Sequence, residues 1–209
     1  GAIWANGVTE LTRCAFEGNT ADDATAEDAT AIVVAKGANM SLYGCSVENH
    51  YADGNANTII IRDNASLYIG ADSYGNRSLI KGNTTKFGGA IRVIQDKNKT
   101  STSTLDVEAT TFEENIGQYG GAIIAYGPSD VNLYNGVVFK ENYSSKGNGG
   151  AILFESKGTL TCNRCHFQSN RANNEGGAIK VDNSSAKIYL NATTFKDNYQ
   201  DAEPAGTTI

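Results

Sequence analysis

Hydrophobic residues recur along the chain in short alternating runs, which are separated by segments rich in glycine and asparagine. The runs Ile91-Arg92-Val93, Ile152-Leu153-Phe154 and Ile179-Lys180-Val181 suit the two-residue period of a β-strand. A second apolar pair follows later in each unit, as at Leu105 and Val107. No segment keeps a 3.6-residue period for three turns, so we expect an all-β chain of short strands without helices.

These runs belong to an internal repeat with two signatures. Gly-Gly-Ala-Ile stands at residues 88–91, 120–123, 149–152 and 176–179, and Phe-x-x-Asn begins at Phe16, Phe112, Phe139, Phe167 and Phe195. The isoleucines that start the units lie 27 to 32 residues apart, at Ile3, Ile32, Ile59, Ile91, Ile123, Ile152 and Ile179. A repeat of this length without helices indicates stacked supersecondary units.

Such units are best closed by coiling into a right-handed parallel β-helix of about seven coils, with 27–32 residues per coil. Each strand then pairs with its counterpart one coil away, about 4.8 Å along the axis. We expect a single β-helix segment over residues 1–209, without terminal caps. This segment is predicted to be part of a longer chain or a protomer that stacks end to end.

The paired Gly-Gly-Ala-Ile and Phe-x-x-Asn signatures resemble the repeats of chlamydial polymorphic membrane proteins and similar adhesin-like surface proteins. The resemblance covers nearly the whole chain, and the two motifs together are fairly specific to that repeat type. It implies a right-handed β-helix on a cell surface, often involved in adhesion.

Stacking the coils aligns residues into columns, and two of these columns are predicted to be structural. The Phe column should form an interior apolar stack, made of Phe16, Val47, Ile80, Phe112, Phe139, Phe167 and Phe195. The asparagine column should form a turn ladder whose amides satisfy the bent backbone, made of Asn19, Asn83, Asn115, Asn142, Asn170 and Asn198.

The four cysteines also fall into the columns. Cys14 and Cys45 sit two residues before the Phe position in consecutive coils, which places them within disulfide range, and Cys165 shares that column. We expect Cys14–Cys45 and Cys162–Cys165 to be disulfide staples or buried thiols. A metal site would need both pairs together, and a thioredoxin-like motif would need a helix.

The strand after each Gly-Gly corner has two outward columns, and the first of them is mostly apolar. It reads Trp4, Val33, Ile60, Arg92, Ile124, Leu153 and Lys180. If Trp4, Val33, Ile60, Ile124 and Leu153 are exposed, they form an apolar stripe of the kind that usually marks an interface. Alternatively, strands favour β-branched residues anyway, or loops fold over this face. On the first interpretation, Ile124→Lys should weaken association and leave the fold intact.

The second outward column brings Glu155 and Asp182 together on adjacent coils, with Lys180 beside them. Paired carboxylates on a β-helix face could be the acid/base pair of a polysaccharide hydrolase or lyase, or a cation site. However, the column supplies only these two acids, and His50 and His166 lie elsewhere. We therefore expect no catalytic residues, no metal and no cofactor, and keep the enzyme as the alternative.

Two segments break the regular spacing. Residues 20–30 carry four carboxylates but lack the Asp-x-Asp-x-Asp-Gly pattern of a calcium loop, so we expect a solvated loop. The segment from Tyr68 to Ser78 inserts roughly eight residues with two tyrosines, and insertions in solenoids often carry binding.

Composition indicates the class of partner and the location of the protein. Seventeen basic against twenty-three acidic side chains give a net charge of −6, which argues against a nucleic-acid partner. No run of eighteen apolar residues exists, so we expect no membrane insertion by this segment. Eight sequons fit a glycosylated extracellular protein, although repeats rich in Asn, Ser and Thr also produce sequons readily: Asn39, Asn64, Asn76, Asn83, Asn98, Asn142, Asn183 and Asn191.

These observations together predict a non-enzymatic extracellular or cell-surface β-helix that serves as an adhesin, stalk or fibre scaffold. It would present its loops and apolar stripe to a protein or glycan partner, and could associate with itself end to end or laterally. The alternative is a carbohydrate-active β-helix that uses the face of Glu155 and Asp182.

Overall fold

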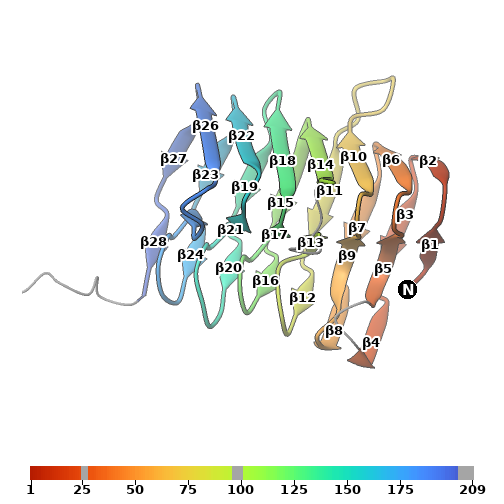
Figure 1. Ribbon diagram of the computed structural model, residues 1–209, viewed down its shortest axis with the longest axis horizontal. Helices are drawn as coiled ribbons and strands as arrows, with labels where there is room; N and C mark the ends of the chain where they lie inside the picture. Colours follow the sequence, from red (N-terminus) through yellow and green to blue (C-terminus); the bar gives the residue numbers. More distant parts are fainter. Residues whose placement is uncertain (25–27, 96–100, 202–209) are drawn as a thin grey trace, which may run out of the picture.

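The chain is a right-handed parallel β-helix of seven coils, as the repeat predicts. The computed structural model describes residues 1–24, 28–95 and 101–201. Every coil contributes one strand to each of four parallel sheets, which run side by side along the rod (Figure 1). In sheet A the isoleucines that start the repeats pair with one another, from Ile3 with Ile32 to Ile152 with Ile179.

The four sheets follow one another in each coil, and we call them A, B, C and D. Sheet A contains the strands that follow the Gly-Gly corner: β1 (Ile3–Ala5), β5 (Ala29–Val34), β9 (Asn57–Ile61), β13 (Ile91–Ile94), β17 (Ile123–Gly127), β21 (Ile152–Ser156) and β25 (Ile179–Val181). Sheet B contains β2 (Val8–Thr12), β6 (Asn39–Tyr43), β10 (Ser66–Gly70), β14 (Ser103–Glu108), β18 (Ser129–Tyr134), β22 (Thr159–Asn163) and β26 (Lys187–Asn191).

Sheets C and D are built of shorter strands. Sheet C, which carries the Phe column, contains β3 (Ala15–Glu17), β7 (Ser46–Glu48), β11 (Ser78–Lys81), β15 (Thr110–Glu113), β19 (Val138–Lys140), β23 (His166–Gln168) and β27 (Thr194–Lys196). Sheet D contains β4 (Thr20–Ala24), β8 (Tyr51–Gly54), β12 (Thr84–Thr85), β16 (Ile116–Gly117), β20 (Tyr143–Ser144), β24 (Arg171–Ala172) and β28 (Tyr199–Gln200).

Sheets A, B and C enclose the main core, which apolar columns from all three sheets fill. The predicted Phe column is confirmed as an interior stack. The rings of Phe112 and Phe139 stack with centroids 4.8 Å apart, and those of Phe139 and Phe167 lie 4.7 Å apart. Phe195 continues the stack at 5.0 Å from Phe167, but in the last coil it is 48% exposed. The spacing of the rings therefore follows the spacing of the strands.

The asparagine column is confirmed as a hydrogen-bonded ladder from Asn83 to Asn198, at the corner between sheets C and D. Its inner members are buried, whereas Asn198 is half-buried, and His50 separates the ladder from Asn19. The Nδ2 of Asn115 donates to the carbonyl of Ile80 (2.8 Å) and to the Oδ1 of Asn142 (2.9 Å), and the neighbouring asparagines repeat this pattern. The residue before each ladder position has a positive φ, between 53° and 64°: Gly18, Asn49, Gly82, Glu114, Glu141, Ser169 and Asp197. The ladder thus provides hydrogen-bond partners for backbone groups at a sharp corner, where the positive φ is costly for residues other than glycine.

Sheet D forms a thin second layer with the Gly-Gly corners. A Cβ placed on Gly121 would lie 2.6 Å from the backbone nitrogen of Tyr143 in the next coil, so only glycine lets the two backbones approach this closely. The inward residues of sheet D are correspondingly small, as at Ala52, Ser144 and Ala172. The Gly-Gly signature therefore marks the contact between the returning chain and sheet D.

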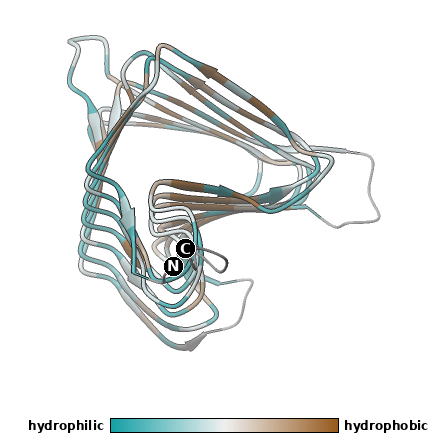
Figure 2. Cartoon of the chain, turned by 90° about the vertical axis from the view of Figure 1, so that its left-hand side faces the viewer, coloured by the Kyte–Doolittle hydropathy of each residue, from teal (hydrophilic) through white to brown (hydrophobic). Residues whose placement is uncertain are grey.

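The expected apolar stripe on the first outward column of sheet A is wrong. The register is as predicted, but Val33, Ile60, Ile124 and Leu153 are at most 3% exposed, and only Trp4 is open, at 59%. The connections from sheet D curl back over the start of sheet A (Figure 2), and Gly88 in one of them lies against Ile124. The column is a second small interior and not an interface.

The prediction of a solvated loop for residues 20–30 is also wrong for the part of this segment that the structure describes. Residues 20–24 form β4 of sheet D, and β5 begins at Ala29. Residues 25–27 lie outside the described part of the chain.

Candidate functional site

The exposed stripe of the molecule lies on sheet D. One outward column of this sheet is in register from coil to coil; Thr20 begins it, and Thr84 separates Tyr51 from Ile116. The larger side chains of the column are those of Tyr51, Ile116, Tyr143, Arg171 and Tyr199. The exposed fractions of Tyr51, Ile116 and Tyr199 are 39%, 38% and 51%. We call these five residues the sheet D stripe.

Arg171 joins the aromatic residues at one end of this stripe. Its guanidinium lies 4.7 Å from the ring centre of Tyr143 and 5.7 Å from that of Tyr199, so each ring faces the cation. Asp201 binds the same guanidinium through Nε and Nη2, with both oxygens at 2.9 Å. The rings and the cation therefore hold one another in place on the open face of the sheet.

Sequence reasoning missed the sheet D stripe because its strands are too short to show alternation. Most strands of sheet D span only two residues. One signal was present: the stripe residue directly follows the ladder position, as Tyr143 follows Asn142 and Tyr199 follows Asn198. Reading one residue beyond Phe-x-x-Asn would have found an aromatic-rich column.

Glu155 and Asp182 do line a common hollow, as the second outward column predicts. The hollow has a volume of about 260 Å³ and is also lined by Tyr126, Lys157 and Asn183. Burial and the neighbouring carboxylate of Glu155 raise the pKa of Tyr126, so this phenol stays protonated at neutral pH. The hollow thus offers two carboxylates, an ammonium and a phenol.

The insertion at Tyr68–Ser78 is not part of this hollow. It connects β10 of sheet B to β11 of sheet C, whereas Glu155 lies on β21 of sheet A, three coils further along the rod. Figure 1 shows the insertion projecting beyond the other corners of the helix. A carbohydrate site combining the two carboxylates with this insertion is therefore not assembled.

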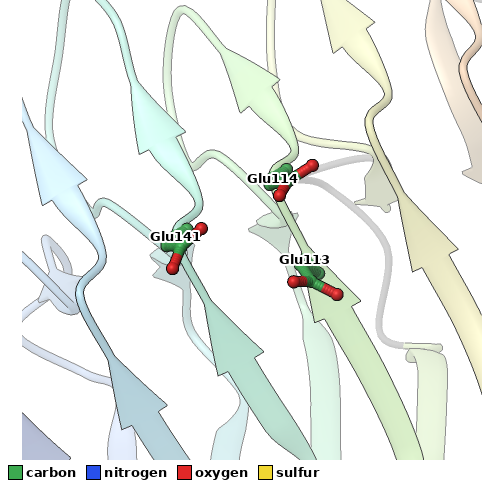
Figure 3. Close-up of side chains that lie close together, drawn as sticks. All are labelled: Glu113, Glu114 and Glu141. Atoms are coloured by element: carbon green, nitrogen blue, oxygen red, sulfur yellow. The ribbon is translucent and has the colours of Figure 1, made fainter.

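A third group of acids lies on the outer side of sheet C, where Glu113, Glu114 and Glu141 come together (Figure 3). One oxygen of each lies within 4.8 Å of the others. Lys140 Nζ lies 2.7 Å from Glu113, and Lys81 Nζ lies 3.5 Å from both Glu113 and Glu114. The hydrogen bond from Lys140 holds the pKa of Glu113 below its usual value. The group is an ion-pair network on the surface.

The cysteines are free thiols, so the expected Cys14–Cys45 and Cys162–Cys165 disulfides are not formed. The alternative of buried thiols holds for three of them, and Cys14 is half-buried. Cys45 Sγ lies 3.4 Å from the carbonyl oxygen of Leu11, and Cys165 Sγ lies 3.6 Å from that of Leu133. The thiols of Cys45 and Cys165 serve as weak donors at the corner between sheets B and C, whereas Cys162 lies within β22.

The carbonyl groups at this corner explain why the column that contains Cys14, Cys45 and Cys165 accepts different residue types. Ser78 occupies the position of Cys45 one coil later, and its hydroxyl donates to the carbonyl of Gly70 at 2.7 Å. Thr110 follows in the next coil and donates to the carbonyl of Glu108. Donor side chains in this column satisfy carbonyl groups at the corner, but Val137, which lies between Thr110 and Cys165 in the column, shows that a donor is not required.

The predicted glycosylation sites divide by burial. Asn83 and Asn142 are fully buried in the ladder, where each Nδ2 donates two hydrogen bonds, so neither can carry a glycan in the folded chain. Asn183 is half-buried, and Asn98 lies outside the described residues. Four sequons remain at exposed positions: Asn39, Asn64, Asn76 and Asn191.

Comparisons with protein-family models, with curated proteins and with solved structures gave no match to this chain. Within residues 1–24, 28–95 and 101–201, no helix has the length and apolar character needed to cross a membrane.

Proposed function

We propose that this chain is a non-enzymatic scaffold of an extracellular or cell-surface adhesive protein, and that the sheet D stripe is its contact surface for a protein partner. The resemblance of the repeats to those of chlamydial polymorphic membrane proteins supports an adhesive role. Exposed sequons such as Asn39 and Asn191 are compatible with that location. Lateral and end-to-end association of chains remain predictions.

The single observation that carries the proposal is the sheet D stripe itself. Tyrosine and arginine are the residue types that dominate the binding energy of protein interfaces. Here they recur on one face, Arg171 lies between Tyr143 and Tyr199, and a rigid ladder directly below fixes their spacing. A stiff rod can therefore present several aromatic contacts at once, with little loss of side-chain freedom on binding.

Site-specific photocrosslinking tests this role. A photoreactive phenylalanine derivative replaces Tyr143 on the sheet D stripe, or Tyr189 on the outer face of sheet B as a control, in the cells that make the protein. Tyr189 is suitable because it is 58% exposed. We expect a covalent adduct with a distinct protein from position 143 and none from position 189. Equal adducts from both positions, or none from position 143, contradict the proposal.

The hollow between Glu155 and Asp182 keeps a polysaccharide hydrolase or lyase as the second candidate. Most glycoside hydrolases use two carboxyl groups that flank the scissile bond, and this hollow is lined by two. Incubation with acidic and neutral polysaccharides should release reducing ends or unsaturated products if this function is correct. Glu155→Gln must then abolish the release while unfolding remains unchanged.

A further inference from the structure

A hollow on the outer face of sheet B has the composition of a sugar-binding site. Its volume is about 410 Å³, within the range typical of small-molecule pockets. It spans four coils, since its floor comes from β2, β6, β10 and β14, and the loop after β10 forms one wall. The lining is made of Glu10, Thr12, Tyr43, Tyr68, Ala71, Asp72, Ser73 and Glu108.

Two tyrosines form an aromatic floor. The rings of Tyr43 and Tyr68 lie 5.3 Å apart and are tilted by 44°. Tyr68 lies along its own strand over Gly70, because a Cβ on Gly70 would come within 2.7 Å of the Tyr68 Cζ atom. The glycine thus provides the space in which the Tyr68 ring rests against the sheet.

The polar groups of the floor are of two kinds. Glu108 is already oriented: it accepts hydrogen bonds from the Tyr68 hydroxyl and from Nδ2 of Asn135 at 2.9 Å. Glu10 and Thr12 are different, because within the described residues neither side chain makes a hydrogen bond or ion pair. The hollow therefore combines a fixed aromatic and carboxylate frame with acceptors and donors that remain unengaged.

The wall of the hollow is held in place. Asp72 accepts hydrogen bonds from the backbone of Tyr74 and Asn76, both at 2.9 Å, and from Nδ2 of Asn76 at 2.8 Å. Arg13 lies 3.4 Å from the same carboxylate and 4.7 Å from the ring centre of Tyr74. The wall is built before any ligand arrives, so binding needs little reordering of this loop.

We propose that this hollow binds one or two residues of a neutral oligosaccharide. The C–H faces of a pyranose pack on aromatic rings, and its hydroxyl groups donate to carboxylates and exchange hydrogen bonds with hydroxyls. Glu10 and Glu108 carry negative charge without a cation among the described residues that line the hollow, so acidic saccharides are repelled. This site lies on a different sheet from the sheet D stripe and does not depend on the proposed function.

An array of neutral, acidic and amino-sugar oligosaccharides tests the proposal with the full chain, followed by calorimetric titration of the strongest neutral saccharide. Glu10→Gln preserves shape and removes the charge, and Tyr68→Ala removes the floor. We expect each to weaken binding tenfold or more, whereas Tyr189→Ala, elsewhere on sheet B, and Tyr143→Ser, on the sheet D stripe, leave binding unchanged.

Four outcomes overturn the proposal. The first is the absence of binding to any neutral saccharide at millimolar concentration, and the second is a preference for acidic saccharides. The third is unchanged affinity in Glu10→Gln, which remains informative even if Tyr68→Ala fails to fold. The fourth is loss of binding upon addition of EDTA, which would mean that a bound cation mediates recognition of the saccharide.

Discussion

Ile116 and Ile124 lie on the consecutive strands β16 and β17, and both side chains leave their sheets on the outward side. Ile116, on sheet D, is 38% exposed, whereas Ile124, on sheet A, is fully buried. The difference arises from the connections between the sheets. Those that lead from sheet D to sheet A cover the outward face of sheet A, whereas nothing in the described residues covers the outward face of sheet D. Alternation tells which side of a strand a residue occupies, but the connections decide whether that side meets water.

The largest expected effect comes from placing a charge at these two isoleucines. Ile124→Lys buries an ammonium without a partner, so we expect it to lower the free energy of unfolding by about 4 kcal/mol or more. Ile116→Lys leaves the charge in solvent and should change stability by less than about 0.5 kcal/mol. Urea unfolding of both variants measures the difference. Similar stabilities would mean that the two faces are equally exposed.

The burial of these residues also shows how much of the structure the sequence predicts. The repeat predicts the coils, the Phe stack and the asparagine ladder correctly, because these depend on side chains that recur in register. The prediction failed for Val33, Ile60, Ile124 and Leu153, because neighbouring parts of the chain cover these side chains and alternation along a strand does not predict such cover. Ala29 packs with Val33 and Ile60, and Gly88 lies against Ile124. The sheet D stripe was missed for the opposite reason, since two-residue strands such as β20 contain no alternation to read.

A smaller effect tests the cover itself. A Cβ on Gly88 would lie 2.7 Å from Cγ2 of Ile124, and a β-branched side chain cannot easily move aside. Gly88→Ala should therefore cost about 1–3 kcal/mol through overpacking.

A double-mutant cycle provides the control for that change. In an Ile124→Ala background the clash is removed, so Gly88→Ala should then cost clearly less than in the parent chain. Additive costs would show that the D-to-A connection does not press on the column of sheet A, and the explanation for its burial would fail.

The smallest expected effect concerns His50 and Tyr51, at the start of the sheet D stripe. These sequence neighbours differ in exposure, as Ile124 and Ile116 do. Tyr51 is exposed, while His50 is 1% exposed and occupies an asparagine position of the ladder. Its Nδ1 accepts the backbone N–H of Asn19 at 3.1 Å, but Nε2 has no partner within hydrogen-bonding geometry. Asparagine at this position could donate as its ladder neighbours do, so His50→Asn should stabilise the fold by about 1 kcal/mol at pH 7.

The two histidines of the chain allow the same contrast to be measured against pH. Burial lowers the pKa of His50 below its ordinary value, so the unfolded chain takes up a proton that the folded chain resists. Stability should therefore be lost as pH falls below about 6.5 and level off below the folded-state pKa. The His50→Asn variant should lose less stability over this window, whereas His166→Asn, at an exposed position of β23, should retain the dependence of the parent. If His166→Asn flattens the pH profile of thermal unfolding and His50→Asn does not, the titrating group is on the surface, and burial in the ladder is not what couples this fold to pH.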